Sequence, residues 1–229
     1  MSTIAQNLTK IRQRIQSAAL QAQRDPKDVH ILAVSKAHSV GNIREAYQAG
    51  LQRFGESYLQ EALPKINALE DLPLEWHFIG PIQSNKTKAI AEYFNWVHSV
   101  DRLKIASRLS EQRSAHLKPL NICIQVNVSY ETTKSGIVQQ ALEEFAAQLS
   151  GLPHLRLRGL MAIPQKTDDI KQQRAMFAGL RQMFDDLNQR GYDLDTLSMG
   201  MTSDLEAAVL EGATLVRVGT GLFGSRTGK

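Results

Sequence analysis

The stretch His30-Ile-Leu-Ala-Val-Ser-Lys36 sets the first constraint on the fold. It is short and almost continuously apolar, which is typical of a strand buried on both faces, as in a parallel sheet. Seven further strand-like runs follow, separated by amphipathic helical stretches, and they begin near Arg53, Glu75, Trp96, Leu120, Leu155, Asp195 and Thr214. Eight alternating units in 229 residues predict an α/β fold. A closed (β/α)8 TIM barrel fits this count better than a doubly wound sheet, which usually has about five or six strands.

The helical stretches carry start and stop signals. An amino-terminal helix within residues 1–24 is expected to pack on the barrel, because apolar side chains recur there at spacings of three and four. One further helix is expected to start at Ser39 and to stop at Gly50. Others are expected to start at Asp101, at Thr167 and at the capping box Ser203-Asp-Leu-Glu206. No linker or low-complexity tract divides the chain, so residues 1–229 are predicted to form one domain.

The composition is that of an ordinary soluble globular protein, with 42% hydrophobic and 22% charged residues. Lys and Arg number 27 against 23 Asp and Glu, and these cations are scattered rather than clustered, so no nucleic-acid partner is expected. The polar amino terminus and the lack of a long apolar run predict a cytoplasmic protein without a membrane span. The six histidines show no metal-ligand spacing, and the single cysteine, Cys123, is interpreted as a core residue.

Residues at the carboxyl ends of the strands carry the chemistry in a barrel of this kind. Lys36 directly follows the first strand, where desolvation would lower its pKa and make it an amine nucleophile for a carbonyl. The alternative is a solvated lysine at a strand end. His77, near the end of the third strand, is a candidate to stack on or hydrogen-bond a planar ring, and is equally compatible with a core position.

The loops after the seventh and eighth strands are the recurrent phosphate site of this barrel. Ser198, Gly219 and Thr220 are therefore candidate phosphate ligands, although each also fits a purely structural turn or cap. The string Gly219-Thr-Gly-Leu-Phe-Gly224 matches a dinucleotide fingerprint. That interpretation fails, because only five residues follow where the motif requires a helix, a second strand and an acidic residue.

Several longer strings occur together and in order. They are Ala33-Val-Ser-Lys36, Phe54-Gly-Glu-Ser-Tyr58, Trp76-His-Phe-Ile-Gly-Pro-Ile-Gln-Ser-Asn-Lys86, Lys134-Ser-Gly136, Arg158-Gly-Leu-Met-Ala-Ile-Pro164, Leu197-Ser-Met-Gly-Met-Thr-Ser-Asp204 and Val216-Arg-Val-Gly-Thr220. With these blocks, nearly the whole chain resembles the pyridoxal phosphate homeostasis proteins of the YggS type. The resemblance implies a barrel similar to the amino-terminal domain of alanine racemases, the fold type III group of pyridoxal phosphate (PLP) proteins.

The resemblance also implies roles for individual residues. PLP would be held as an aldimine on Lys36, Arg217 would face the pyridine nitrogen, and the phosphate would lie against Ser198, Gly219 and Thr220. His77 is included among the cofactor-binding residues, and no catalytic or metal-binding residue is assigned. Ser57 stands where the family pattern more often has an asparagine, so the role of that asparagine is not transferred to Ser57.

The leading hypothesis is a monomeric protein that stores PLP or delivers it to apo-enzymes, with little or no turnover. A permanently charged Arg217 would weaken the electron sink that carbanion chemistry needs, and the chain ends at Lys229 without the second domain of alanine racemases. The alternatives are a PLP-dependent racemase-like enzyme, a PLP-independent aldolase that uses Lys36, and RNA binding through the basic surface.

Overall fold

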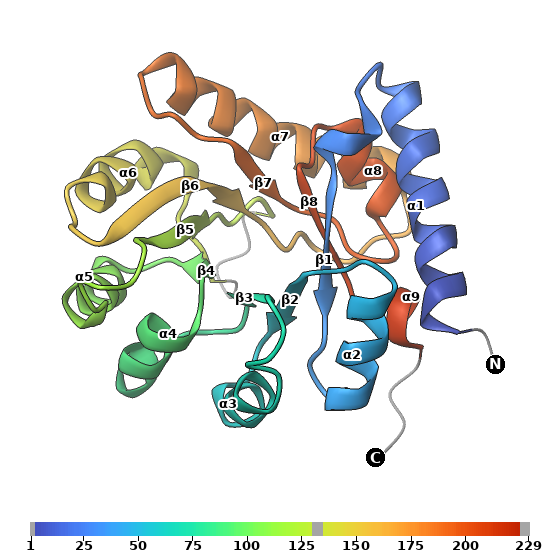
Figure 1. Ribbon diagram of the computed structural model, residues 1–229. Coiled ribbons are helices and arrows are strands. Elements are labelled where there is room, and N and C mark those ends of the chain that lie inside the picture. Colours follow the sequence, from blue (N-terminus) through green and yellow to red (C-terminus); the bar gives the residue numbers. More distant parts are fainter. Residues whose placement is uncertain (1–2, 130–134, 225–229) are drawn as a thin grey trace.

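The computed structural model describes residues 3–129 and 135–224, and in them the predicted barrel is confirmed. Eight parallel strands pair in sequence order, and the first strand closes the barrel against the eighth. Figure 1 shows the helices arranged as a ring around these strands. The alternation of buried strand and amphipathic helix therefore gives the architecture that the sequence predicts.

The strands begin close to the residues expected. They are β1 (His30–Val34), β2 (Arg53–Glu56), β3 (Glu75–Phe78), β4 (Trp96–Val100), β5 (Leu120–Gln125), β6 (Leu155–Met161), β7 (Thr196–Ser198) and β8 (Leu215–Val218). The register pairs His77 of β3 with Gly55 of β2 and with Trp96 of β4. Register shifts interrupt the ladders between β4 and β5 and between β5 and β6.

The helices are α1 (Ile4–Gln21), α2 (Val40–Gln48), α3 (Leu59–Ala68), α4 (Thr87–Tyr93), α5 (Leu103–Gln112), α6 (Leu142–Ser150), α7 (Ile170–Gln189), α8 (Leu205–Leu210) and α9 (Thr220–Phe223). Short 3-10 turns occur at η1 (Pro26–Asp28), η2 (Ser84–Lys86) and η3 (Gln139–Ala141). The amino-terminal helix α1 packs against α2, α8 and α9, as expected for a helix laid on the barrel. Its buried face includes Ile4, Leu8, Ile11, Ile15 and Ala18.

The helix starts are partly as predicted. Ser39 caps α2 by accepting a hydrogen bond from the Asn42 backbone N–H. The start at Thr167 is displaced, because Asp169 is the residue that caps α7 and accepts from the Lys171 N–H. The start predicted at Asp101 is wrong, since α5 begins after Arg102 without a side-chain cap.

The predicted capping box at Ser203 is also wrong. Helix α8 begins at Leu205, and its N-cap Asp204 makes no capping hydrogen bond. The Asp204 carboxylate instead accepts from the Met201 N–H at 2.6 Å, and the Glu206 carboxylate pairs with Arg14 of α1. The Asp204 carboxylate therefore closes the loop after β7, and the Glu206 carboxylate attaches α1 to α8.

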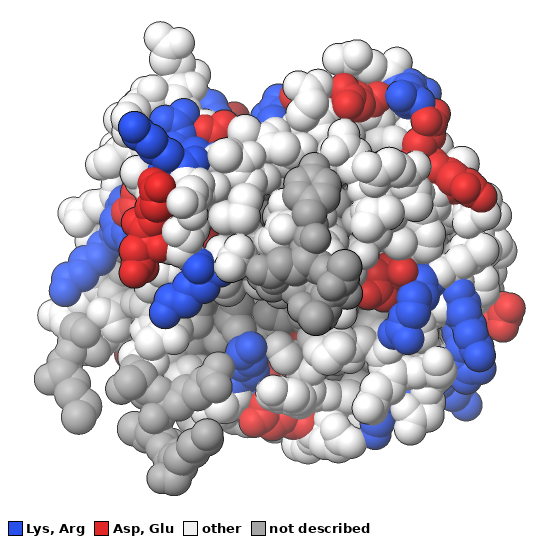
Figure 2. Space-filling model, turned by 180° about the vertical axis from the view of Figure 1, so that it is seen from behind, with Lys and Arg blue, Asp and Glu red and all other residues white. Residues whose placement is uncertain are grey.

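One continuous hydrophobic core lies between the strands and the helices. Cys123 is fully buried inside the barrel, and burial raises the pKa of its thiol, as expected for a core residue rather than a nucleophile. Figure 2 shows basic and acidic side chains interspersed over one face of the molecule. Within residues 3–129 and 135–224, no helix combines the length and the apolar character needed to cross a bilayer.

Candidate functional site

A cavity of about 440 Å³ opens at the carboxyl ends of the strands. Residues that follow β1, β2, β3, β6, β7 and β8 line it, and Lys36, Arg217, Gly219 and Thr220 are among them. Apolar walls come from Val34, Ile79, Ile163 and Met201. The structure thus brings four of the six predicted site residues to one cavity, at the end of the barrel where active sites occur.

Lys36 lies in a tight turn directly after β1. The His38 N–H donates to the Ser35 carbonyl oxygen across this turn, and Ala37 has a positive φ of 63°. A non-glycine residue in this conformation is held there only by its surroundings. One such contact is the Ala37 N–H, which donates to the Glu61 carboxylate of α3 at 3.1 Å.

A buried ion pair fixes the residue before Lys36. The Ser35 hydroxyl donates to the Glu56 carboxylate at 2.7 Å, and the Lys65 ammonium donates to both Glu56 and the Ser35 carbonyl oxygen at 2.9 Å. Glu56 is fully buried, and this burial raises the pKa of its carboxyl although Lys65 and Ser35 act in the opposite direction. These contacts hold the backbone that presents Lys36 to the cavity.

The loops after β7 and β8 form the opposite wall of the cavity. Thr202, Ser203, Gly219 and Thr220 all line it, and the Gly221 N–H donates to the Thr202 hydroxyl. Gly200 has a φ of +87°, and a Cβ there would lie 2.4 Å from the Ala208 Cβ, so this loop requires glycine. Residues with hydroxyl side chains and the start of α9 therefore line the same cavity as Lys36.

Arg217 connects the cavity to the barrel interior. Its guanidinium donates from Nη1 to the carbonyl oxygen and the hydroxyl of Ser198, at 2.5 and 2.9 Å, and from Nη2 to the Ala162 carbonyl oxygen at 2.8 Å. Burial lowers the pKa of Arg217 to about 10, and the charge of Asp204 opposes this shift. The guanidinium thus stays protonated at neutral pH.

Two predicted site residues lie elsewhere. The Ser198 hydroxyl is inside the barrel, where it accepts from Arg217 and contacts His98, so the structure does not place it with the cavity-lining residues of the loops after β7 and β8. His77 also lies inside the barrel, bonded to His98 and Glu75. Because side chains alternate along a strand, the inward-facing positions of β3 and β7 place both residues below the cavity floor.

The sequence-based prediction missed other residues. Thr202 and Ser203 line the cavity, and the only signal for them was their place in the loop after β7. His98 was missed as well, although a histidine in the otherwise apolar run Trp96–Val100 was a visible signal. Lys134, part of the motif Lys134-Ser-Gly136, lies outside the described residues.

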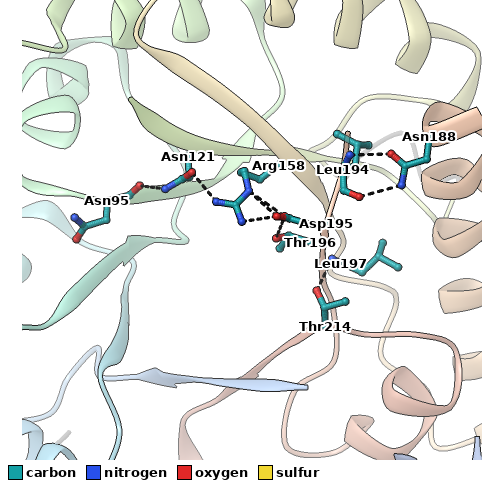
Figure 3. Close-up of polar contacts among 9 residues, drawn as sticks. All are labelled: Asn95, Asn121, Arg158, Asn188, Leu194, Asp195, Thr196, Leu197 and Thr214. Atoms are coloured by element: carbon teal, nitrogen blue, oxygen red, sulfur yellow. Dashed lines mark hydrogen bonds and ion pairs between the residues drawn. The ribbon is translucent and has the colours of Figure 1, made fainter. Parts of the chain in front are cut away.

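The opposite, amino-terminal mouth of the barrel holds a polar cavity of about 750 Å³. Figure 3 shows Arg158 at this mouth between Asn121 and Asp195, with bonds of 2.9 Å to Asn121 and of 2.5 to 3.0 Å to Asp195. Arg53 and Glu75 form a second ion pair there at 3.2 Å. Among the described residues, no group of three His, Cys, Asp or Glu side chains is placed to bind a metal ion.

We compared the sequence and the structure of this chain with those of known proteins. Residues 3–227 match the family model for the alanine racemase amino-terminal domain. A pyridoxal phosphate homeostasis protein of Pseudomonas aeruginosa is 62% identical over 226 residues, which are 99% of this chain and 97% of that protein. The pyridoxal phosphate homeostasis protein of Escherichia coli K12 is 48% identical over 99% of this chain and 98% of its own length.

A solved structure agrees with these relatives. PipY of Synechococcus elongatus, determined with PLP bound, is 41% identical and superimposes with a TM-score of 0.80. The match covers 93% of this chain and 100% of the PipY chain. The chain therefore belongs to the family of pyridoxal phosphate homeostasis proteins.

Proposed function

We propose that this protein binds PLP in the cavity at the carboxyl ends of the strands and takes part in PLP homeostasis. The observation that carries the proposal is the joint presence of Lys36, Arg217 and the loops after β7 and β8 around one cavity. The names of the relatives and the PLP bound to PipY support it.

The donor set of the cavity fits the chemistry of PLP. The cofactor offers an aldehyde to an amine, a phosphate to N–H and hydroxyl donors, and a planar ring to apolar walls. Lys36 supplies the amine, while Thr202, Ser203 and Thr220 supply hydroxyls on the facing wall. A Cβ added at Gly219 would come within 3.4 Å of Val34, so a larger side chain would take up space at the edge of the cavity.

We propose that the site retains the cofactor rather than using it for rapid turnover. A protonated pyridine nitrogen makes PLP a strong electron sink. A charged guanidinium that faces this nitrogen disfavours its protonation, because the two positive charges would repel. Arg217 lines the cavity and is protonated at neutral pH, so its placement supports a binding role.

The proposal extends to location and partners. We propose that the protein works as a monomer in the cytoplasm and contacts apo-enzymes transiently when it delivers PLP. Mass measurement in solution tests whether the protein is a monomer, and cell fractionation tests the location.

Delivery is tested by mixing the PLP-loaded protein with an apo-enzyme in the presence of a trap for free PLP and following the activation of the enzyme. Activation no faster than with an equal amount of trapped free PLP would contradict delivery.

Binding itself is tested by titrating the purified protein with PLP while following its visible absorption. We expect a saturable change with one PLP per chain, and weaker binding of pyridoxal. Inorganic phosphate should compete, because it would occupy the same donors. A protein whose spectrum remains that of free PLP at all concentrations would contradict the proposed function.

A further inference from the structure

A chain of polar side chains runs through the barrel interior from the Lys36 cavity toward the opposite mouth. The Arg217 Nη1 lies 2.9 Å from the Ser198 Oγ, which lies 2.9 Å from the His98 Nδ1. The His98 Nε2 lies 2.9 Å from the His77 Nδ1, and the His77 Nε2 lies 2.9 Å from the Glu75 Oε1. We call these five residues the barrel column: Glu75, His77, His98, Ser198 and Arg217.

The two ends of the barrel column fix the direction of every hydrogen bond in it. A guanidinium only donates and a carboxylate only accepts, so the His77 Nε2 must donate to Glu75. With neutral histidines, the His77 Nδ1 then accepts from the His98 Nε2, and the His98 Nδ1 accepts from the Ser198 hydroxyl. Only this arrangement satisfies all four contacts, and it aligns every donor toward Glu75.

Burial of both histidines agrees with this arrangement. Burial lowers the pKa of His77, against the opposing effect of Glu75, and it lowers the pKa of His98 still more clearly. Both rings are therefore neutral near pH 7, as the hydrogen-bond directions require.

The barrel column gives the buried Arg217 a second source of charge stabilisation, beside the carboxylate charge of Asp204 that opposes the lowering of its pKa. Arg217 is only 4% exposed, and its three hydrogen bonds go to neutral oxygens of Ser198 and Ala162. Buried guanidinium groups ordinarily need a carboxylate partner. Aligned hydrogen bonds polarise one another, so the negative charge of Glu75 stabilises the guanidinium through the intervening side chains.

Packing inside the barrel keeps the histidines in place. The His77 and Trp96 rings stack with centroids 5.4 Å apart and an interplanar angle of 7°. Trp96 belongs to a small apolar cluster with Cys123 and Met161, which lies next to the barrel column. The rings therefore have little freedom to turn away from their hydrogen-bond partners.

We propose that His77, His98 and Ser198 are positioning residues that orient the Arg217 guanidinium and hold its charge in the cofactor cavity. This inference rests on the proposed function, since it assigns the barrel column a role in PLP binding. It also means that a change at Glu75, whose side chain is 38% exposed at the amino-terminal mouth, is transmitted to the cofactor at the other end of the barrel.

Two variants interrupt the barrel column at different points. Glu75→Gln removes the charge at the exposed end and keeps an oxygen that accepts from His77. His98→Phe removes both central hydrogen bonds at similar side-chain volume. The matched control is Asp195→Asn, which makes the same carboxylate-to-amide change at the same mouth, in the Arg158 pair outside the barrel column.

Each protein is measured for the dissociation constant of PLP, the wavelength of maximum absorption of bound PLP and its unfolding midpoint. We expect PLP binding to weaken on the order of threefold in Glu75→Gln and on the order of tenfold in His98→Phe. We also expect the absorption maximum to shift in both variants, because the charge beside the ring changes. A residue that serves only folding would not move the absorption maximum of the bound cofactor. Asp195→Asn should match the wild type in affinity and spectrum.

The outcomes separate the two proposals. A wild-type protein that does not bind PLP contradicts the proposed function. A wild-type protein that binds PLP while Glu75→Gln leaves affinity and spectrum unchanged overturns the barrel column alone. Equal effects of Glu75→Gln and Asp195→Asn on PLP binding also overturn the barrel column. The effect would then come from the total charge at the amino-terminal mouth of the barrel. If His98→Phe does not fold, Glu75→Gln decides the question.

Discussion

The Lys65 ammonium lies 2.9 Å from the buried Glu56 carboxylate, and together they hold the strand end from which Lys36 enters the cavity. Glu56 comes from β2 and Lys65 from α3, so the pair bridges the barrel and its helical layer. The second carboxylate oxygen of Glu56, Oε2, is buried without a hydrogen-bond partner among the described residues. The buried negative charge of Glu56 is therefore stabilised mainly by the ammonium group of Lys65.

The first prediction is that Lys65→Met destabilises the fold by about 3 to 5 kcal/mol, because it leaves a buried carboxylate without its partner. The double variant Glu56→Gln/Lys65→Met should recover much of this loss. Urea unfolding at neutral pH measures both, and Lys88→Met on the exposed surface of α4 is the control. A double variant as unstable as Lys65→Met would show that the buried charge is not the cause.

The second prediction concerns Lys36 as the amine that binds PLP. After incubation with PLP and reduction by borohydride, the cofactor mass should be found on the peptide that contains Lys36. Lys36→Ala should lose this covalent label and retain weaker binding through the groups that face the phosphate. Lys88→Ala is the matched lysine control. Label on another lysine in the wild-type protein would contradict the assignment.

The third prediction separates the phosphate-facing groups from the barrel interior. Ser203→Ala and Thr220→Val each remove a hydroxyl that lines the cavity, and each should reduce the preference for PLP over pyridoxal. The loss should be about 0.5 to 1.5 kcal/mol, or more where the partner is charged. Ser198→Ala should weaken both ligands alike, because its hydroxyl bonds Arg217 and His98. The measurement is the ratio of the two dissociation constants, and a preference lost only in Ser198→Ala would refute this division.

The sequence predicted the barrel, and it predicted for a physical reason that Lys36, Gly219 and Thr220 lie around one cavity. Strands buried on both faces are continuous apolar runs, and residues that end such runs must meet at one end of the barrel, which brings Lys36 near Gly219 and Thr220. The contact between His98 and Ser198 joins residues 100 positions apart. It depends on strand register and on which alternate residues face inward, and a single sequence does not specify either one.

The fourth prediction concerns how the stability of the fold changes at acid pH. Burial alone would raise the pKa of Glu75, but the hydrogen bond from His77, the positive charge of His77 once acid protonates it, and the charge of Arg53 lower it to about 2. A carboxyl whose pKa is lower in the folded state stabilises the fold above its unfolded pKa, which is 4.5 here. This contribution is lost as the pH falls toward about 2.

Glu75→Gln should therefore be less stable than the wild type above pH 4.5, and the difference should shrink as the pH falls toward 2. Urea unfolding at a series of pH values measures the difference, with Glu92→Gln, an exposed carboxylate of α4, as the control. A difference that stays constant across this range would show that the pKa of Glu75 is not lowered by folding.

The last prediction is that the PLP-loaded protein exchanges the α-protons of amino acids no faster than free PLP does. Racemisation by two bases needs an acid or base within about 3 Å of the substrate carbon on each face. Lys36 lines the cavity and can serve one face. Of two conceivable second bases, His77 is bonded to His98 and Glu75 inside the barrel. The other, Tyr58, is 60% exposed and does not line the cavity. An Arg217 guanidinium that faces the pyridine nitrogen, as we propose, further disfavours the electron sink that proton removal requires. Exchange of both enantiomers of several amino acids in heavy water, followed by NMR with free PLP as the reference, tests this. Stereoselective exchange well above that reference, and abolished by Lys36→Ala, would establish a racemase-like activity instead of retention.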